Sequence, residues 1–306
     1  MKNGVIALDE VKGTGCKIQN SLYEKKTLKE IEHSITKRYR KRIWSKFVRA
    51  ISEFNLVEEG DKVAVAVSGG KDSMLMAKLF QELKRHWQVN FYVEFIAMDP
   101  GYHESNRKLL IENCNYLNIP LHIFESRIFD VVDNVAKDYP CYICAKMRRG
   151  ALYSKAQQLG CNKLALGHHF NDVIETTLLN LFYGGSFKTM LPKLKSKNFK
   201  HMELIRPLYL VKESDIKAFM KNAGISSLNC GCIVAAGKTG SKRYEVKNMI
   251  EKMKVNFKDI DKSIFHAAQN VNLDGILSWK KDGKSYSYLE FYDNEKENAE
   301  DIIKNR

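Results

Sequence analysis

The feature that most constrains this chain is a short apolar run that leads through two glycines into a helical pattern. Residues 63–67, VAVAV, are apolar and rich in β-branched side chains, which is typical of a buried parallel strand. The run ends at residues 68–73, SGGKDS, and apolar residues then recur at helical spacing. This order favours a phosphate cradle, because the amides and the dipole at a helix N-terminus attract anions.

The residues of this turn suit phosphate binding. Gly69 and Gly70 permit backbone conformations and a close approach that a Cβ would block. Lys71 can neutralise phosphate, and the hydroxyls of Ser68 and Ser73 can donate hydrogen bonds. The GxxxxGK[ST] spacing of a Walker A loop is absent, so the turn is either a different phosphate loop or an ordinary glycine turn.

Predicted strands and helices alternate from residue 61 to about 229. We expect strands over 63–67, 91–98, 121–125, 163–169 and the start of 203–211, and helices over 104–118, 127–137, 145–159, 171–182 and 212–222. Regular alternation predicts an α/β fold in which helices flank both faces of a parallel sheet. Ligands bind beyond the carboxyl ends of such strands. Ser68, Asp99 and residues 167–169 fall at these ends, so they should converge at one edge.

Residues 167–172, GHHFND, carry further polar side chains beside this edge. His168, His169 and Asp172 favour a role in positioning a phosphate or an acceptor base, although single histidines are often structural. Glu175 lies one turn further on the same helix face as Asp172 and is either functional or a structural partner.

The segment before the core, residues 27–57, is predicted to form one long helix. Thr27 and Glu30 make a capping-box pattern, and apolar residues recur at three- and four-residue steps. The other faces are strongly basic and include Lys41 and Arg42. This pattern indicates either a helix that lies along a phosphate backbone or a solvated charged face.

The segment after the core is less regular. A helix is expected around 244–253, and Asp282-Gly283 is a candidate hairpin turn within the apolar and aromatic stretch 275–292. No role follows from these residues. We therefore divide the chain into an N-terminal segment with a basic helix (1–57), a nucleotide-binding core (58–240) and a C-terminal extension (241–306).

Charge and cysteine content limit the function classes. The net charge of +14 suits a polyanionic partner such as nucleic acid. Seven cysteines without a secretion signal argue against a disulfide scaffold and for metal or sulfur chemistry. We find no apolar run long enough to cross a bilayer and no signal-peptide pattern, so we expect a cytoplasmic protein without membrane association.

Two cysteine pairs are candidates for that chemistry. Cys141 and Cys144 form a CxxC pair, and the positive charges of the neighbouring Lys146, Arg148 and Arg149 would favour thiolate by lowering the thiol pKa. Cys230 and Cys232 form a CxC pair far along the chain. Four thiolates would suit a structural zinc site, whereas three thiolates on a 4Fe–4S cluster would leave one iron open for chemistry. Unrelated buried thiols are the remaining alternative.

The string SGGKDS resembles the PP-loop of ATP pyrophosphatases. It is followed by CYICAKMRRGALY (141–153), LALGHHFNDVIETTLLNLFYGG (164–185), LIRPLYLVKESDI (204–216) and a cysteine pair. This order is similar to that of the tRNA 2-thiocytidine synthases, the TtcA family, over roughly residues 40–235. The chain departs from the family in having CxC where a second CxxC is usual, and Asn229 where the family has proline.

The resemblance implies the PP-loop fold and a tRNA sulfurtransferase. Such an enzyme uses ATP and Mg²⁺ to adenylate the C2 carbonyl of cytidine 32 in tRNA and replaces the oxygen with sulfur delivered at a 4Fe–4S cluster. By position, the cluster ligands are Cys141, Cys144 and Cys230, with Cys232 as the alternative third ligand. The partners implied are tRNA and a sulfur donor such as a cysteine desulfurase, and a homodimer is an option.

The site residues follow from the residue chemistry and the resemblance together. We expect catalytic roles for Lys71, Asp72, Cys141 and Cys144, with Asp72 a candidate for holding Mg²⁺. The residues expected to bind ATP are Ser68, Gly69, Gly70, Lys71, Asp72, Ser73, Asp99, Gly167, His168 and Asp172. Those expected to contact tRNA are Arg148, Arg149, Lys41 and Arg42, and the basic stretch up to Lys200 is either a further contact or a solvated loop.

Four other functions remain open from the sequence. One is 2-thiolation of a tRNA uridine, although that related family has N-terminal CxxC pairs and only Cys16 precedes the loop here. The second is cluster-free chemistry on a cysteine persulfide. The third is a non-catalytic tRNA-binding protein with a structural zinc site. The fourth is a lysidine-type tRNA ligase, which shares the PP-loop but needs no cysteines.

Overall fold

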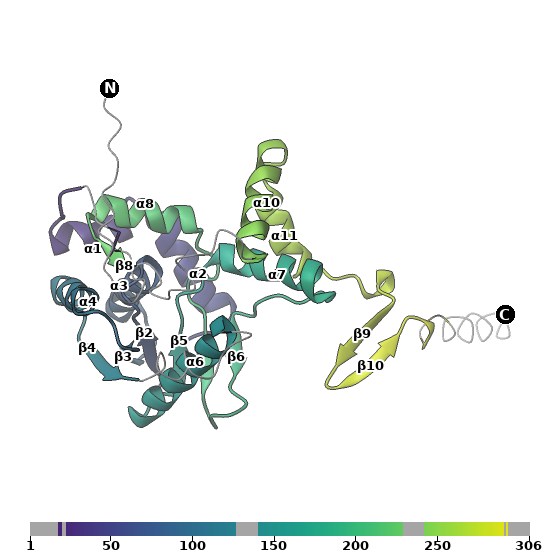
Figure 1. The fold of residues 1–306 in the computed structure, drawn as a ribbon, viewed down its shortest axis with the longest axis horizontal. Coiled ribbons are helices and arrows are strands. Elements are labelled where there is room, and N and C mark those ends of the chain that lie inside the picture. Colours follow the sequence, from purple (N-terminus) through teal and green to yellow (C-terminus); the bar gives the residue numbers. More distant parts are fainter. Residues whose placement is uncertain (1–17, 20–22, 127–139, 229–241, 291, 293–306) are drawn as a thin grey trace.

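The computed structural model describes residues 18–19, 23–126, 140–228, 242–290 and 292, and Figure 1 shows their arrangement. The predicted helix over 127–137 lies outside these ranges. So do Cys16, Cys230 and Cys232.

A six-stranded sheet forms the centre of the molecule, with the strand order β4-β3-β2-β5-β7-β6 (Figure 1). The strands are β2 (Lys62–Ala66), β3 (Tyr92–Asp99), β4 (Leu121–Glu125), β5 (Lys163–Ala165), β6 (Lys193–Lys195) and β7 (Glu203–Ile205). Neighbouring strands are parallel, except that β6 is antiparallel to β7. The predicted α/β fold is therefore confirmed.

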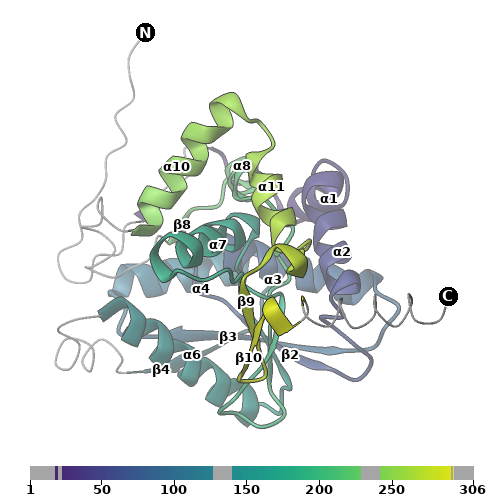
Figure 2. The same ribbon diagram turned by 90° about the vertical axis from the view of Figure 1, so that its right-hand side faces the viewer.

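Helices pack on both faces of the sheet (Figures 1 and 2). They are α3 (Lys71–His86), α4 (Glu104–Tyr116), α6 (Pro140–Gln158), α7 (Phe170–Gly184) and α8 (Glu213–Ala223). The strand residues alternate between two cores, as the two-residue period of a strand requires. Val63 and Val65 of β2 pack in the larger core with α3, whereas Ala64 packs with Tyr153 and Ala156 of α6.

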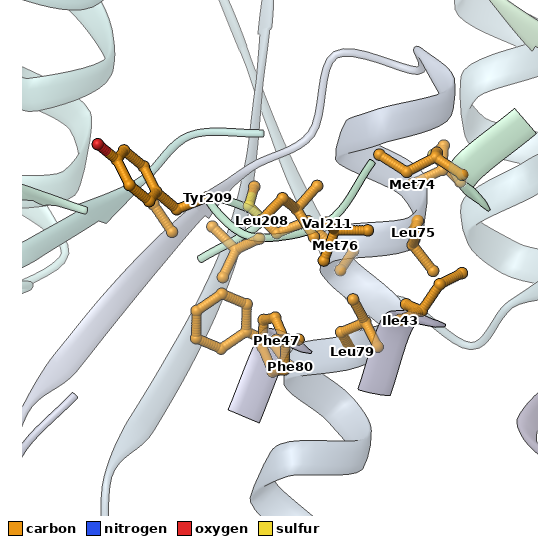
Figure 3. Packing of buried hydrophobic residues seen from close by; sticks show 14 of the residues in the cluster. Ile43, Phe47, Met74, Leu75, Met76, Leu79, Phe80, Leu208, Tyr209 and Val211 are labelled. Atoms are coloured by element: carbon orange, nitrogen blue, oxygen red, sulfur yellow. The ribbon is translucent and has the colours of Figure 1, made fainter. Parts of the chain in front are cut away.

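The larger core joins the N-terminal helices to the sheet layer. Figure 3 shows Phe47 against Phe80 of α3, with ring centroids 5.7 Å apart and ring planes at 84°. Leu208 and Val211, from the chain after β7, are buried in the same cluster. Burying a large apolar side chain stabilises the fold by roughly 1.5–3 kcal/mol. The N-terminal helices therefore belong to the core of the molecule.

The prediction of one long helix over 27–57 is wrong. The segment forms α1 (Leu28–Thr36), a π-helical turn η1 (Arg40–Trp44) and α2 (Ser45–Glu53). The buried residues recur at steps of four: Ile31, Ile35, Tyr39, Ile43, Phe47 and Ile51. In an α-helix each such step would drift by about 40° around the axis. The break after α1 and the wider π-helical turn absorb the drift and keep the stripe on one core. The capping box at Thr27 and Glu30 is confirmed.

The basic stretch before β7 is not only a loop. Residues 193–195 form the edge strand β6, with Leu194 opposite Leu204 of β7. The connection from β6 to β7 is short, and a short connection permits only an antiparallel pair. The sheet is therefore mixed at this edge and parallel elsewhere.

The described part of the C-terminal extension contains two helices and a hairpin. Helix α10 (Lys242–Asn256) contains the predicted helix 244–253, and α11 (Ile260–Ala267) was not predicted. Both helices pack against α7 (Figures 1 and 2). A short 3₁₀ helix (Leu273–Gly275) precedes the hairpin of β9 (Ser278–Lys281) and β10 (Lys284–Ser287). Asp282 and Gly283 form its turn with φ of 52° and 79°, so the predicted hairpin is confirmed.

Two short segments meet beside the central sheet. Strand β1 (Ile18–Gln19) pairs antiparallel with β8 (Ser227–Leu228). Within the described residues, no helix is both long and apolar enough to cross a membrane.

Candidate active site

The loop between β2 and α3 is folded on itself by its two serines. The Ser68 amide donates to Ser73 Oγ at 3.1 Å, and Ser73 Oγ donates to the Gly70 carbonyl at 3.0 Å. The N-cap of α3 is Gly70, which has no side chain to bond the first amides of the helix. Those amides and the dipole of a 16-residue helix therefore remain for an anion, as the sequence predicts.

Two glycines let other segments pack directly against this loop. Gly69 has φ of +79°, and a Cβ there would lie 2.7 Å from Leu228 Cδ1. The Leu228 amide also donates to the Gly69 carbonyl at 2.9 Å. A Cβ on Gly167 would lie 3.3 Å from the backbone of Asp72 and Ser73. The end of β8, two residues before Cys230 in the sequence, and the turn after β5 therefore both touch the loop.

Lys71 is held between two carboxylates. Its Nζ lies 2.9 Å from Asp72 Oδ2 and 3.3 Å from Glu213 Oε1 at the start of α8. Burial acts to lower the pKa of Lys71, but the charges of Asp72 and Glu213 outweigh burial and raise it above the ordinary lysine value. The lysine is therefore a cation at neutral pH, and it is the first residue of α3.

Asp72 has one oxygen that no donor satisfies. Its Oδ1 is buried without a hydrogen-bond partner, and His169 Nε2 lies 3.8 Å away. A desolvated carboxylate oxygen without a donor suits a hard cation. Mg²⁺ usually takes one or two carboxylates and completes its shell with water and substrate phosphates. Among the described residues, no group of three His, Cys, Asp or Glu side chains could hold a metal by itself, so phosphate oxygens would have to contribute.

The two neighbouring histidines have different surroundings. His169 is the N-cap of α7: its ring accepts the Asp172 amide at 3.3 Å, and Asp172 Oδ2 accepts the His169 amide at 2.8 Å. Nδ1 of His168 is buried and has no partner. Burial lowers the pKa of His168 to about 4, so its ring is neutral at physiological pH. His168 is therefore the freer of the two rings, while His169 and Asp172 are tied to the helix start.

Asp99 shapes the turn beyond β3. Its Oδ1 accepts the amides of Gly101 at 3.0 Å and Tyr102 at 2.8 Å. Its Oδ2 lies 3.5 Å from Arg107 Nε. Both oxygens thus have protein partners, and the side chain fixes the strand end beside the phosphate loop.

The first group of site residues that sequence reasoning missed is a network of charges. Glu213 Oε2 lies 2.8 Å from Lys247 Nζ of α10 and 3.1 Å from Lys217 Nζ. Burial acts to raise the pKa of Glu213, but the hydrogen bond from Lys247 and the charge of Lys71 hold it well below the usual carboxyl range. Asn171 Oδ1 accepts the Glu213 amide at 3.0 Å and so fixes the start of α8 against α7.

A second missed residue, Arg243 of α10, binds the carboxylates of α7. Its Nη2 lies 2.6 Å from Asp172 Oδ1, and its Nε lies 2.8 Å from Glu175 Oε2. Glu175, which is 5% exposed, is thus a structural partner as well as a site neighbour. Glu213 lies within the string 204–216, which could have pointed to it. Arg243 had no such signal, because the sequence of α10 shows no pattern that links this helix to the phosphate loop.

The third missed residue, Arg206, directly follows β7. It is 5% exposed, and its guanidinium donates to the Leu191 carbonyl. Its Nε is buried without a partner. Burial and the nearby charge of Arg149 lower the pKa of Arg206 to about 10. Its position places a desolvated cation at the carboxyl edge of the sheet.

The predicted cluster ligands are described only in part. Cys141 and Cys144 fall at the N-terminal end of α6, whereas Cys230 and Cys232 lie outside the described residues. Two cysteines three residues apart at a helix N-terminus suit a metal or cluster, because the helix end stabilises thiolate. Cys114 and Cys161, interpreted as ordinary residues, are free and buried, and burial raises their pKa to about 12 and about 11.

The predicted tRNA contacts lie on two separate elements. Lys41 and Arg42 are exposed on η1, where Arg42 Nη1 lies 3.7 Å from Asp215 Oδ1 of α8. Arg149 is exposed and Arg148 half-buried on α6, downstream of the cysteine pair. The structure therefore offers α6 and η1 as two cationic surfaces.

The chain is similar to proteins of known activity. A family model described as PP-loop domain matches residues 40–228. A tRNA-cytidine(32) 2-sulfurtransferase from Marinomonas sp. (strain MWYL1) is 38% identical over 231 residues, which cover 73% of this chain and 80% of the relative. The enzyme of the same name from Citrifermentans bemidjiense is 38% identical over 238 residues, which cover 77% of this chain and 92% of the relative.

A solved structure shares the fold. The U34-tRNA thiolase NcsA from Methanococcus maripaludis, solved with its 4Fe-4S cluster, matches with a TM-score of 0.59 and 21% identity. The match covers 74% of this chain and 76% of that chain. At this identity the likeness shows the fold alone.

Proposed function

Since this chain belongs to the tRNA-cytidine(32) 2-sulfurtransferase family of PP-loop proteins, we propose that it replaces the C2 oxygen of a tRNA cytidine with sulfur in an ATP-dependent reaction. The observation that carries the proposal is the phosphate loop, whose Gly69 is hydrogen-bonded to β8 just before Cys230. This contact joins the phosphate loop to Leu228, which lies two residues before Cys230, the third ligand that we propose for the cluster. The base expected is cytidine 32, as the names of the relatives state.

The reaction has two displacements. The C2 oxygen of the base forms a bond to the α-phosphorus of ATP, the bond to the bridging oxygen breaks, and pyrophosphate leaves. A sulfur nucleophile then forms a bond to C2, the C2–O bond breaks, and AMP leaves with the original oxygen. Adenylation makes this oxygen part of a good leaving group. In the first displacement, the site has to stabilise the negative charge that develops on the phosphates.

The phosphate loop supplies that stabilisation. The amides that open α3 and the ammonium of Lys71 bind the phosphates, and Lys71 exchanges its contact with Glu213 for one with phosphate oxygen. The unsatisfied Oδ1 of Asp72 is suited to hold Mg²⁺. His168, neutral and unpaired at Nδ1, is suited to bond the nucleotide or the base. Ser68, Ser73, Asp99, Gly167 and Asp172 are the other residues around the loop that we propose as contacts of ATP.

The cysteines determine the second step. Cys141 and Cys144, with Cys230 or alternatively Cys232 as the third ligand, would hold the 4Fe-4S cluster. When bound, the cluster supplies an iron without a protein ligand, which can carry the sulfur to be transferred. The cationic side chains that follow the pair on α6, Lys146 and Arg149, favour the thiolate forms of the two cysteines.

The remaining partners follow from the same chemistry. A sulfur donor such as a cysteine desulfurase would supply the sulfur, and the reaction with tRNA would take place in the cytoplasm. We also propose that the chain forms a homodimer, which analytical ultracentrifugation would test.

The two displacements can be tested separately with purified, anaerobically reconstituted protein. The wild type should release pyrophosphate and AMP only when tRNA is present and should form 2-thiocytidine. Lys71→Ala should lose pyrophosphate release, because the charge that binds the phosphates is gone. Cys141→Ser should lose thiolation but keep a single turnover of pyrophosphate release. Full thiolation by Cys141→Ser, or pyrophosphate release without tRNA, would contradict the proposal.

A further inference from the structure

A groove between α6 and the edge strand β6 carries a concentration of positive charge. It encloses about 530 Å³ and is lined by residues of α6, of β6 and of the turn after β6. Its lining residues include four cations: Lys146, Arg149, Lys195 and Lys197. No carboxylate is among the described residues that line it.

The cations of this groove, which we call the α6–β6 groove, are not used by the fold. All four are exposed, and no ion pair joins any of them to a carboxylate in the described part of the chain. By contrast, Lys193, which also belongs to β6, lies 3.2 Å from both Glu58 and Glu203. Lys193 is thus paired within the fold, whereas Lys195 and Lys197 line the groove without a carboxylate partner among the described residues.

The shape of the groove is set by well-bonded backbone. The Ser196 amide donates to the Met202 carbonyl at 2.8 Å, and the Phe199 amide donates to Ser196 Oγ at 3.1 Å. The ring of Phe199 stacks on Tyr153 of α6, with centroids 5.0 Å apart and ring planes at 16°. The turn after β6 is therefore fixed to α6, so the four cations are presented on a formed surface.

The groove is connected to the catalytic edge through α6. Arg149 stands five residues after Cys144, which corresponds to about 7–8 Å along a helix. Its charge also acts on two groups at the sheet edge, buried Arg206 and His168. A chain lying in the groove would therefore run toward the cysteines and the phosphate loop.

We propose that the α6–β6 groove binds the phosphate backbone of an RNA strand, which, on the proposed function, is the tRNA that presents its base to the active site. Four separated cations suit successive phosphates of a polymer, each held mainly by charge. A free nucleotide is a poorer match, because its phosphates are already provided for by the loop amides and Lys71. The stacked Phe199 and Tyr153 form the floor beneath this path.

The test compares two neutralised double variants of the full-length protein. Lys195→Gln with Lys197→Gln removes two groove cations. Lys252→Gln with Lys258→Gln is the matched control, because it removes equal charge from exposed residues of α10 and of the turn between α10 and α11. That turn lies at the opposite end of the molecule from α6 in Figures 1 and 2. Circular dichroism and thermal melting would establish that both variants are folded.

Fluorescence anisotropy with labelled tRNA, over a range of salt concentrations, gives the main readout. The groove variant should bind tRNA about tenfold more weakly than the control, and its log–log salt slope should be smaller by about 1–2. In the thiolation assay, the KM for tRNA should rise while kcat and the KM for ATP stay constant.

Three results would overturn the proposal: equal tRNA affinity of the groove variant and the control, a rise in the KM for ATP without a change in tRNA binding, or a change of oligomeric state in place of the loss of affinity. The second would assign the groove to nucleotide phosphate and the third to a second copy of the chain. If the wild type binds tRNA but does not thiolate it, the proposed function fails. The proposal that the α6–β6 groove binds RNA would still be supported in that case, provided that the groove variant binds tRNA more weakly and the control variant does not.

Discussion

At the scale of single residues, the phosphate loop depends on Gly69 for two reasons. Its φ of +79° is strained for any residue with a Cβ, and a Cβ would also press on Leu228. Gly160 is the control, because it also has a positive φ of +71° but a Cβ there would meet no neighbour within 4 Å. Its substitution therefore measures the backbone strain without a steric clash. We expect Gly69→Ala to lose about 1 kcal/mol more free energy of unfolding than Gly160→Ala, and to raise the KM for ATP. Urea denaturation of both variants checks this, and equal losses would contradict it.

His168 should make stability depend on pH. Burial lowers its pKa from 6.5 to about 4, so between these values the unfolded chain binds a proton that the folded chain excludes. Stability from this group is therefore complete above about pH 6.5 and falls as the pH decreases toward 4. From pH 7 to pH 5, the wild type should lose about 1–2 kcal/mol more free energy of unfolding than His168→Gln. The free energies of unfolding of both proteins are measured by urea titration across this pH range. If the wild type and His168→Gln lost stability equally, the folded protein would not keep the His168 ring neutral.

Sequence reasoning could identify candidate site residues where neighbouring residues in the sequence form a recognisable motif. Ser68 to Ser73 were found because strand, glycines and helix are adjacent, and Asp99 because it ends a strand. Glu213, Arg243 and Arg206 were missed because their partners lie far away in the sequence. Arg243, for example, contacts Asp172, which lies 71 residues earlier. Nothing in the neighbourhood of such a residue marks it as part of a site.

At the scale of elements, the attachment of α10 to α7 is the feature to test. Arg243→Ala would leave Glu175 buried without its cation, at a cost of about 2–3 kcal/mol in the free energy of unfolding. The control is Arg49→Ala, which breaks an exposed pair with Glu53 on α2 and should cost under about 0.5 kcal/mol. Chemical denaturation measures both. Losses of similar size would mean that the contact of Arg243 with buried Glu175 does not hold α10 in place.

The elements of the core could be predicted because their hydrophobic periods are regular. The errors arose where tertiary packing overrode a local pattern. A stripe with four-residue steps looked like one helix, but only the core shows that α1, η1 and α2 must change pitch to bury it. Similarly, β6 is three residues long and was hidden among lysines, and its pairing with β7 is what makes it a strand.

At the scale of the whole molecule, the order of the sheet brings distant stretches to one edge. The loop after β2, the end of β3 and the turn after β5 could be placed together from the sequence, because parallel neighbours share their carboxyl edge. The docking of the C-terminal extension could not, since α10 reaches the site through ion pairs rather than through a repeated pattern. The candidate site is therefore bordered by elements of the core and by ion pairs from α10 of the extension.

The central claim is that this chain makes 2-thiocytidine in tRNA, with the loop that starts at Ser68 activating the oxygen and the cysteines delivering the sulfur. Nucleoside mass spectrometry of tRNA from a deletion strain tests it most directly. We expect 2-thiocytidine to disappear on deletion, to return with the wild-type gene, and to stay absent with Lys71→Ala or Cys141→Ser. An unchanged level of 2-thiocytidine in the deletion strain would contradict the account.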